Sequence, residues 1–262
     1  MRRILITTIG AAMLLALAAS VFATPSPNSA VLITRVYNDC PASLLTTVNN
    51  YPAQIVIDDV NQGCVGFANL HVWRFSEDGS NPAVFSNGDA FRFCATLLIT
   101  GTGQCEAGLQ VRPWWSESDG RFNVRTTDGE IACFGGRLPF YSFTGSHGLN
   151  YVKGNPIQLE IIYLPNGLSM ASPATIEYKL VYGGNPYTSG PLPFDQGNPA
   201  EDPPHGLWGI LSPTYVGGHD QFFVGQSGPT GNARVEWNDI CYEALIVAVE
   251  DKAWGTIKNM YR

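Results

Sequence analysis

Two short runs of alternating polar residues carry the side chains best suited to bind a ligand. Within each run the polar residues recur at even intervals, so on a β-strand they point to one face of the sheet. If the two strands are neighbours, they form a surface rich in hydrogen-bonding groups. Such a surface could bind the hydroxyls of a carbohydrate, or it could be a plain solvated face. The six residues are Glu106, Gln110, Arg112, Arg121, Asn123 and Arg125.

Three aromatic residues lie beside these runs or in expected loops. Sugar rings stack on flat aromatic side chains, so these residues are candidates for the rim of a carbohydrate site. Trp114 and Trp115 follow the first run directly, and Tyr187 lies in a stretch rich in Gly and Pro. For each of them, a role in packing is the alternative.

Catalysis would need acids in a fixed arrangement, because retaining glycosidases place two carboxylates about 5–5.5 Å apart. Glu106 has no second acid on its own strand, Glu117 and Asp119 lie beside a turn, and Glu177 is a lone acid on an expected strand. The sequence also lacks a G-x-S-x-G nucleophile motif, an H-E-x-x-H zinc motif, a P-loop and an EF-hand loop. We therefore assign no catalytic residue and favour binding over catalysis.

The elements that position these residues are short strands. The chain has 28 Gly, 18 Pro and 11% aromatic residues, a composition typical of a turn-rich all-β protein. Apolar or alternating runs are separated by Asp-Gly and Asn-Gly turn signals. They predict an all-β fold, a two-sheet antiparallel β-sandwich. The expected strands cover 54–58, 90–99, 106–112, 121–125, 157–163, 174–182, 221–224 and 233–237, and 182–204 is expected to be a long surface loop.

The order of the motifs resembles a known superfamily. Glu-Ala-Gly-Leu-Gln at 106–110 precedes the Trp pair, and Asp-Gly-Arg-Phe-Asn-Val follows at 119–124. Gly-Leu-Trp-Gly-Ile at 206–210 and Val-Glu-Trp-Asn-Asp-Ile at 235–240 complete the series. Over 51–243 the chain resembles the concanavalin A-like lectin/glucanase superfamily, particularly its laminin-G-like jelly-roll members. The resemblance implies two curved sheets that bind carbohydrate on one face or at a rim. The chain departs from the glucanases' alternating acids, and the fold alone does not define a function.

Jelly-roll domains of this kind often carry calcium, which makes three acids candidate ligands. Asp58, Asp59 and Asp239 are the residues that we would test. Asp58 and Asp59 are neighbours and would face opposite ways on a regular strand. Calcium prefers six to eight oxygen ligands, so these acids would need further partners, and a solvated turn residue is the alternative for each of them.

The first 23 residues have the three parts of a secretory signal peptide. Arg2 and Arg3 form the positive segment, residues 4–19 are mostly apolar, and small residues stand at Val21 and Ala23. Cleavage after Ala23 would leave 239 residues (262 − 23). We therefore expect a secreted or extracytoplasmic protein, exported by a bacterial cell.

Export changes the interpretation of the six cysteines, all of which follow the expected cleavage site. An even number of cysteines in an exported protein favours disulfides over metal ligation, although 15 pairings are open. A turn-like Thr-Gly-Thr-Gly between Cys94 and Cys105 suggests that these two pair. Cys40 with Cys64 is the next candidate pair.

The expected organisation has four parts. A signal peptide (1–23) precedes an N-terminal leader with a first strand (24–50), and the jelly-roll domain covers 51–243. The C-terminal strand and helical tail (244–262) could dock a protein partner, or could simply be a packed or frayed end.

The overall charge and hydropathy exclude two classes of partner. The net charge of −7 leaves no basic footprint for nucleic acid, and no second apolar stretch approaches the ~18 residues of a membrane span. The sequence therefore predicts a secreted, non-catalytic carbohydrate-binding or cell-surface interaction module, with a glycan or cell-surface polysaccharide as partner. A glycoside hydrolase or polysaccharide lyase with a non-standard active site is one alternative, and a structural envelope protein is another.

Overall fold

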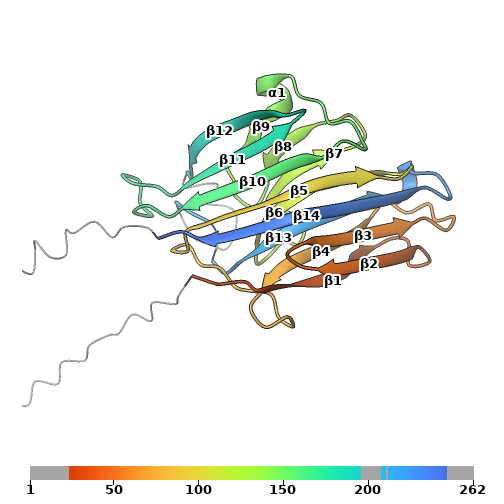
Figure 1. The fold of residues 1–262 in the computed structure, drawn as a ribbon, viewed down its shortest axis with the longest axis horizontal. Helices are drawn as coiled ribbons and strands as arrows, with labels where there is room; N and C mark the ends of the chain where they lie inside the picture. Colours follow the sequence, from red (N-terminus) through yellow and green to blue (C-terminus); the bar gives the residue numbers. More distant parts are fainter. Residues whose placement is uncertain (1–23, 196–207, 211, 247–262) are drawn as a thin grey trace, which may run out of the picture.

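Two antiparallel sheets of seven strands each form a sandwich (Figure 1). The structure is a computed structural model that describes residues 24–195, 208–210 and 212–246. Sheet A contains, in spatial order, β1 (Ser29–Asn38), β4 (Asn69–Ser76), β13 (Thr214–Phe223), β6 (Gln104–Pro113), β7 (Arg121–Arg125), β8 (Ile131–Phe134) and β9 (Tyr141–Ser142). Sheet B contains β12 (Asn185–Pro193), β11 (Thr175–Tyr182), β10 (Ile157–Leu164), β5 (Phe91–Thr100), β14 (Asn232–Ala244), β3 (Gln54–Val60) and β2 (Leu44–Asn50). This is the all-β jelly-roll sandwich that the sequence predicts.

The core lies between the sheets and is made by one residue in two along most strands, as the pleat requires. Aromatic rings join the two layers. Trp73 of sheet A packs edge-on against Trp237 of sheet B with ring centroids 6.2 Å apart, and Phe75 packs against Phe93 at 5.6 Å. The indole nitrogen of Trp237 also donates a hydrogen bond to the carbonyl of Gly108, at 3.1 Å, which ties sheet B to the middle of sheet A.

A polar cluster interrupts this core between β3, β4 and β13. The Asp59 carboxylate accepts from Asn69 at 2.6 Å and contacts His71 Nε2 at 3.1 Å. His71 Nδ1 accepts a hydrogen bond from the backbone N–H of Arg35. The ring hydrogen of His71 is therefore on Nε2, which donates a hydrogen bond to Asp59. Asp220 is paired with His71 across the strands and is fully buried, yet neither carboxylate oxygen has a hydrogen-bond partner among the described residues.

Helix is scarce in the described residues. Helix α1 (Phe143–His147) is one short turn, capped by the Ser142 hydroxyl, which accepts the N–H of Gly145. It ends at Gly148, which has a positive φ of 67°. A 3-10 turn, η1, covers Val224–Gln226. In the part of the chain that the structure describes, no helix is both long and apolar enough to cross a membrane.

Most expected strands are present, and three expectations need correction. The expected strand at 221–224 is the end of a much longer one, β13, which begins at Thr214. The stretch expected to be a loop contains the edge strand β12, whose prolines are tolerated because an edge strand has one unpaired side. The segment 24–50, expected to be a leader with one strand, contains the two strands β1 and β2, which are edge strands of the two sheets.

Two segments discussed above fall largely or wholly outside the described residues. These are the expected signal peptide and all but the first three residues of the C-terminal segment (244–262). Strand β14 ends at Ala244, where the C-terminal segment was expected to begin.

The disulfides confirm one expected pair and contradict the other. Cys40 is bonded to Cys64, as expected. Cys94 is bonded to Cys241 on the adjacent strand β14, so the expected Cys94–Cys105 bond is wrong. The reason is that the turn after β5 crosses from sheet B to sheet A instead of closing a hairpin. Cys105 faces the core from sheet A, where it and Cys133 are buried free thiols.

Candidate functional site

Polar side chains cover the outer face of sheet A, the face turned away from the core. The strand register arranges them in rows across β4, β13, β6 and β7. The members of each row, in that strand order, are Tyr215 and Arg112; Arg74, Gly217, Gln110 and Arg121; Val72, His219, Gly108 and Asn123; and Leu70, Gln221, Glu106 and Arg125. The six polar residues selected from the sequence therefore share one face, on adjacent strands.

Glycines form the floor in the middle of these rows. A Cβ atom on Gly217 would lie 2.1 Å from the carbonyl oxygen of Trp73, and one on Gly108 would lie 1.9 Å from that of Phe122. Neither position has room for a side chain, because neighbouring backbones approach too closely. The long side chains on either side of Gly217 and Gly108 therefore rise above a floor of bare backbone.

Arg74 and Arg112 place two guanidinium groups at one end of the face. The side chain of Arg74 is only 1% exposed, and its Nη1 donates to the carbonyls of Trp73 and Gly218 at 3.0 and 3.3 Å. Burial and the nearby Arg112 charge lower the pKa of Arg74 to about 9, and the Glu117 carboxylate acts against them. The guanidinium of Arg112 lies 5.0 Å from the centre of the Tyr215 ring, a cation–π contact that holds it in place.

The other two arginines are neutralised within the face. Arg121 donates to Glu106 at 2.9 Å and to Gln221 at 2.6 Å, and also to a loop carbonyl. Arg125 forms ion pairs with Asp128 and Glu130 at 2.6 and 2.7 Å. The charges of Arg121 and Arg125 are therefore balanced by neighbouring acids. The part of the face with an excess of positive charge is the one that contains Arg74 and Arg112.

His219 lies in the middle of the face and is neutral. Its imidazole is fully buried, and burial together with the Arg121 and Arg74 charges lowers its pKa well below the usual value. Its Nε2 donates to the Asn123 side-chain oxygen at 3.0 Å, so the proton is on Nε2. Nδ1 has no well-formed hydrogen bond among the described residues, and an interaction of the ring with the Leu109 backbone partly offsets the lowering of the pKa.

A short loop, residues 114–120, crosses this face. The Gln110 amide donates to the loop carbonyls of Glu117 and Asp119, at 2.9 and 2.7 Å. One cavity of about 470 Å³ is lined by Ile33, Arg74, Asn81, Pro82, Arg112, Trp114, Glu117 and Tyr215. A second, of about 650 Å³, is lined by Val36, Tyr37, Asn38, Asp39, Phe67, Ala68, Glu106, Ser118, Arg121 and Gln221. The loop contributes to both cavities, through Trp114 and Glu117 to the first and Ser118 to the second.

Four buried polar atoms on this face lack a hydrogen-bond partner in the described part of the chain. Buried polar groups in folded proteins are nearly always paired, so a cluster of exceptions is unusual. The four atoms offer two donors and two acceptors, the mixture that a hydroxyl- and carboxyl-bearing ligand would satisfy. They are Arg74 Nη2, Arg112 Nε, Gln110 Oε1 and His219 Nδ1.

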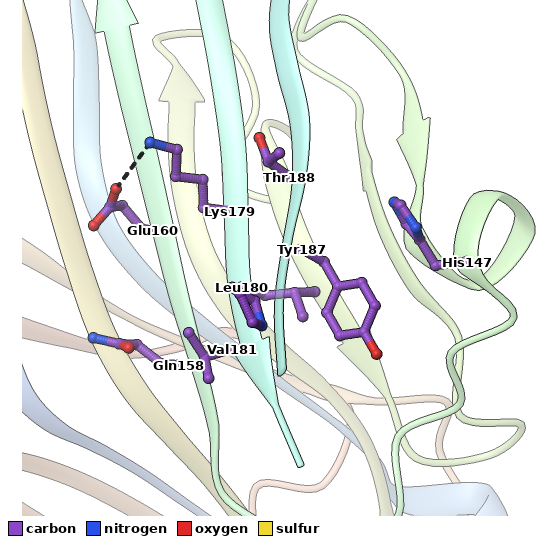
Figure 2. Close-up of a pocket in the computed structure, with 9 residues that line it drawn as sticks. His147, Gln158, Glu160, Lys179, Leu180, Val181, Tyr187 and Thr188 are labelled. Carbon is purple, nitrogen blue, oxygen red and sulfur yellow. Dashed lines mark ion pairs between the residues drawn. The ribbon is translucent and has the colours of Figure 1, made fainter. Parts of the chain in front are cut away.

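The aromatic candidates separate into two places. Trp114 is 38% exposed and lines the smaller cavity, and its ring packs edge-on against Trp115 at 5.7 Å. Tyr187 does not join them. It belongs to sheet B and lines a different cavity of about 600 Å³, where its ring lies 5.3 Å from that of His147 (Figure 2). The same cavity holds the ion pair of Lys179 with Glu160, at 3.9 Å.

The three candidate calcium ligands do not converge. Asp58 and Asp59 point to opposite faces of β3: Asp59 faces the core and Asp58 contacts Asn232 and Arg234. Asp239 lies at the other end of β3, where its backbone N–H bonds to the carbonyl of Ala53. No group of three or more His, Cys, Asp or Glu residues in the described segments is arranged to hold a metal ion. The residues therefore do not fit a shared calcium site.

Sequence reasoning missed Arg74, His219 and Tyr215. The signal was present in part, because Tyr215, His219 and Gln221 recur at even intervals, as strand residues on one face do. The Gly217-Gly218 pair between them was the obstacle, because two glycines usually mark a turn. In this fold both glycines are inside β13, where neighbouring groups leave no space for a side chain.

Comparisons with known proteins find similar folds among solved structures. An alginate lyase from Klebsiella pneumoniae matches with a TM-score of 0.48 and 10% identity, over 76% of this chain and 84% of that one. A family 7 alginate lyase in complex with substrate matches at 0.46 and 10%, over 77% and 82%. A Lotus tetragonolobus seed lectin matches at 0.37 and 8%, over 85% and 96%.

The fold is the two-sheet antiparallel β-sandwich that the motif order implied. No protein-family model matches the sequence, and no curated protein matches it. The similarities to solved structures concern the architecture, so the chemistry of the site rests on the residues of this chain.

Proposed function

We propose that this protein is a secreted carbohydrate-binding module that holds an acidic polysaccharide on the outer face of sheet A. The observation that carries the proposal is the pair of guanidinium groups of Arg74 and Arg112, which line the smaller cavity and each have one nitrogen without a hydrogen-bond partner among the described residues. Guanidinium groups recognise carboxylates through paired, charge-assisted hydrogen bonds. Trp114 lines the same cavity and offers a ring on which a sugar can stack.

The two disulfides support an oxidising compartment, as expected for an exported protein. Carbohydrate sites combine a few fixed polar groups with flat apolar surface, and the smaller cavity has both. The overall negative charge does not oppose binding of an acidic chain at this point, because the paired guanidinium groups set the local field. The narrower laminin-G-like assignment stays a prediction.

Binding measurements with a matched variant would test the proposal. We would titrate the protein with alginate, polygalacturonate and a neutral glucan by calorimetry. Arg112→Met removes a charge from the proposed site, and Arg92→Met removes one from an Arg–Glu pair on sheet B. Loss of one charge-assisted hydrogen bond lowers affinity by roughly 10- to 100-fold. Arg112→Met should therefore weaken binding of acidic polymers by this factor, and Arg92→Met should not.

Two results would contradict the proposal. One is equal affinity for acidic and neutral polymers, and the other is unchanged affinity in Arg112→Met. Export can be followed separately, by N-terminal sequencing of the mature protein, which should begin at Thr24.

A second candidate function, a polysaccharide lyase, is favoured by Arg112 and Tyr215 in the smaller cavity. A β-elimination needs a base to remove the proton next to the sugar carboxylate, so that a carbon–carbon double bond forms as the glycosidic oxygen leaves. Arg112 could stabilise the carboxylate and Tyr215 could protonate the leaving oxygen, whereas His219 is fully buried and lines neither cavity of this face. The ultraviolet absorbance of an unsaturated uronate product would distinguish cleavage from binding.

A further inference from the structure

The Glu117 carboxylate lies between the two guanidinium groups of the smaller cavity. One of its oxygens accepts a hydrogen bond from Arg112, and the other lies 3.8 Å from Arg74 Nη2. The side chain comes from the loop that crosses the face, and it is 36% exposed. A carboxylate of the chain itself therefore stands where the carboxylate of an acidic sugar would bind.

This internal carboxylate fills the place only in part. Two cations face one anion, and Arg74 is almost completely buried, where an unbalanced charge is costly. The distance of 3.8 Å to Arg74 exceeds that of a hydrogen bond, and Arg112 Nε has no partner among the described residues. A ligand carboxylate free to choose its position could bond both guanidinium groups at once.

We propose that Arg74 and Arg112 form a carboxylate subsite in which Glu117 acts as an internal ligand, displaced when a uronate binds. The inference rests on the proposed function and adds how its acidic ligand gains access. Because the Glu117 side chain is partly exposed, a change of its rotamer can move the carboxylate into solvent while Gln110 still holds the loop backbone. Binding is then a competition between two carboxylates for one pair of cations.

The competition lowers the apparent affinity by the fraction of molecules in which the subsite is free. An ion pair with one partly exposed partner favours the occupied state by a factor of about five. Replacing Glu117 with a neutral residue of the same size should therefore strengthen uronate binding about fivefold. A purely structural role for the ion pair predicts no gain in affinity.

The experiment uses the full mature protein and two monosaccharides, glucuronate and glucose. Affinities are measured by NMR titration for the wild type, Glu117→Gln and Glu160→Gln. Glu160 is the matched control because it forms the corresponding Arg–Glu pair with Arg92 on sheet B. We expect about fivefold tighter glucuronate binding by Glu117→Gln, no change for Glu160→Gln, and no glucose response in any of them.

Each result has one meaning. Equal or weaker glucuronate binding by Glu117→Gln overturns the inference, even when the wild type binds acidic polymers. Tighter binding of glucuronate without binding of any polymer supports the subsite and contradicts the proposed function. If Glu117→Gln does not fold, Glu117→Asp serves in its place. Its shorter side chain cannot bridge both cations, so it should also bind glucuronate more tightly than the wild type, and equal or weaker binding would count against the subsite.

Discussion

Replacement of Asp220 with Asn should make the protein more stable, and increasingly so as the pH rises. The wild-type carboxyl is fully buried with both oxygens unpaired in the described structure. Burial raises its pKa well above the usual value, and the charges of Asp59 and Asp58 add to this effect. The folded state therefore holds a proton that the unfolded state releases, so the stability of the wild type falls as the pH rises above the unfolded pKa.

The size of the effect follows from proton linkage. Between the unfolded pKa of about 3.9 and the raised folded pKa, the folded chain holds up to one proton more than the unfolded chain. The free energy of unfolding of the wild type then falls, relative to Asp220→Asn, by up to about 1.4 kcal/mol for each pH unit. Other titrating groups are common to both proteins and cancel in this difference.

Urea unfolding from pH 4 to pH 6 would measure the difference in the free energy of unfolding. Asp78→Asn is the control, because hydrogen bonds from the Asn81 side chain and from the backbone of Asn81 and Ser80 lower the pKa of Asp78. Its stabilising effect is lost only as the pH falls through that lowered pKa, so above pH 4 the control difference should be nearly flat. A flat difference for Asp220→Asn as well would refute the reasoning, because it would mean that the buried charge is compensated.

Two further predictions concern the framework that carries the site. Removing Cys94 and Cys241 together should lower the free energy of unfolding by about 5 kcal/mol, and removing Cys40 and Cys64 should lower it by about 3 kcal/mol. The first loss is larger because the two disulfides close loops with sequence separations of 147 and 24, respectively. Urea unfolding of the two double Ser variants would show whether this order holds. Gly217→Ala should lower the free energy of unfolding by about 1–3 kcal/mol, because its Cβ would lie 2.1 Å from a backbone carbonyl oxygen. An unchanged melting temperature for that variant would contradict the close approach of the strands.

The sequence was sufficient to predict the shared polar face. Alternation over 106–112 and 121–125 indicated which side chains point the same way, and the shared face was expected on the condition that the two strands are neighbours. The register confirms this, since Gln110 is paired with Arg121 and Glu106 with Arg125. Local pattern is informative here because the two strands that form the face are nearly consecutive in the chain.

The rest of the face depends on strands that are far apart in the sequence. Arg74 joins the rows only because β13, more than a hundred residues later, inserts between β4 and β6. No local pattern predicts that insertion, and the glycine pair inside β13 argued for a turn. The incorrect prediction of a Cys94–Cys105 disulfide has the same cause, because a tight turn has the same sequence pattern whether it closes a hairpin or crosses between the sheets.

Two groups of unpaired buried polar atoms in the described structure differ in what could pair with them. Asp220 is enclosed by the core between the sheets, where no ligand can reach it. Burying its unpaired carboxyl therefore affects only the stability of the fold. Arg74 and Arg112 line the smaller cavity of the outer face, which opens to solvent, whereas Gln110 and His219 line neither cavity of that face. A ligand in the smaller cavity can pair with the two guanidinium groups and offset the cost of burying them, whereas it cannot reach Asp220. Asp220→Asn should therefore leave glycan affinity unchanged, whereas substitution of Arg74 or Arg112 should lower it.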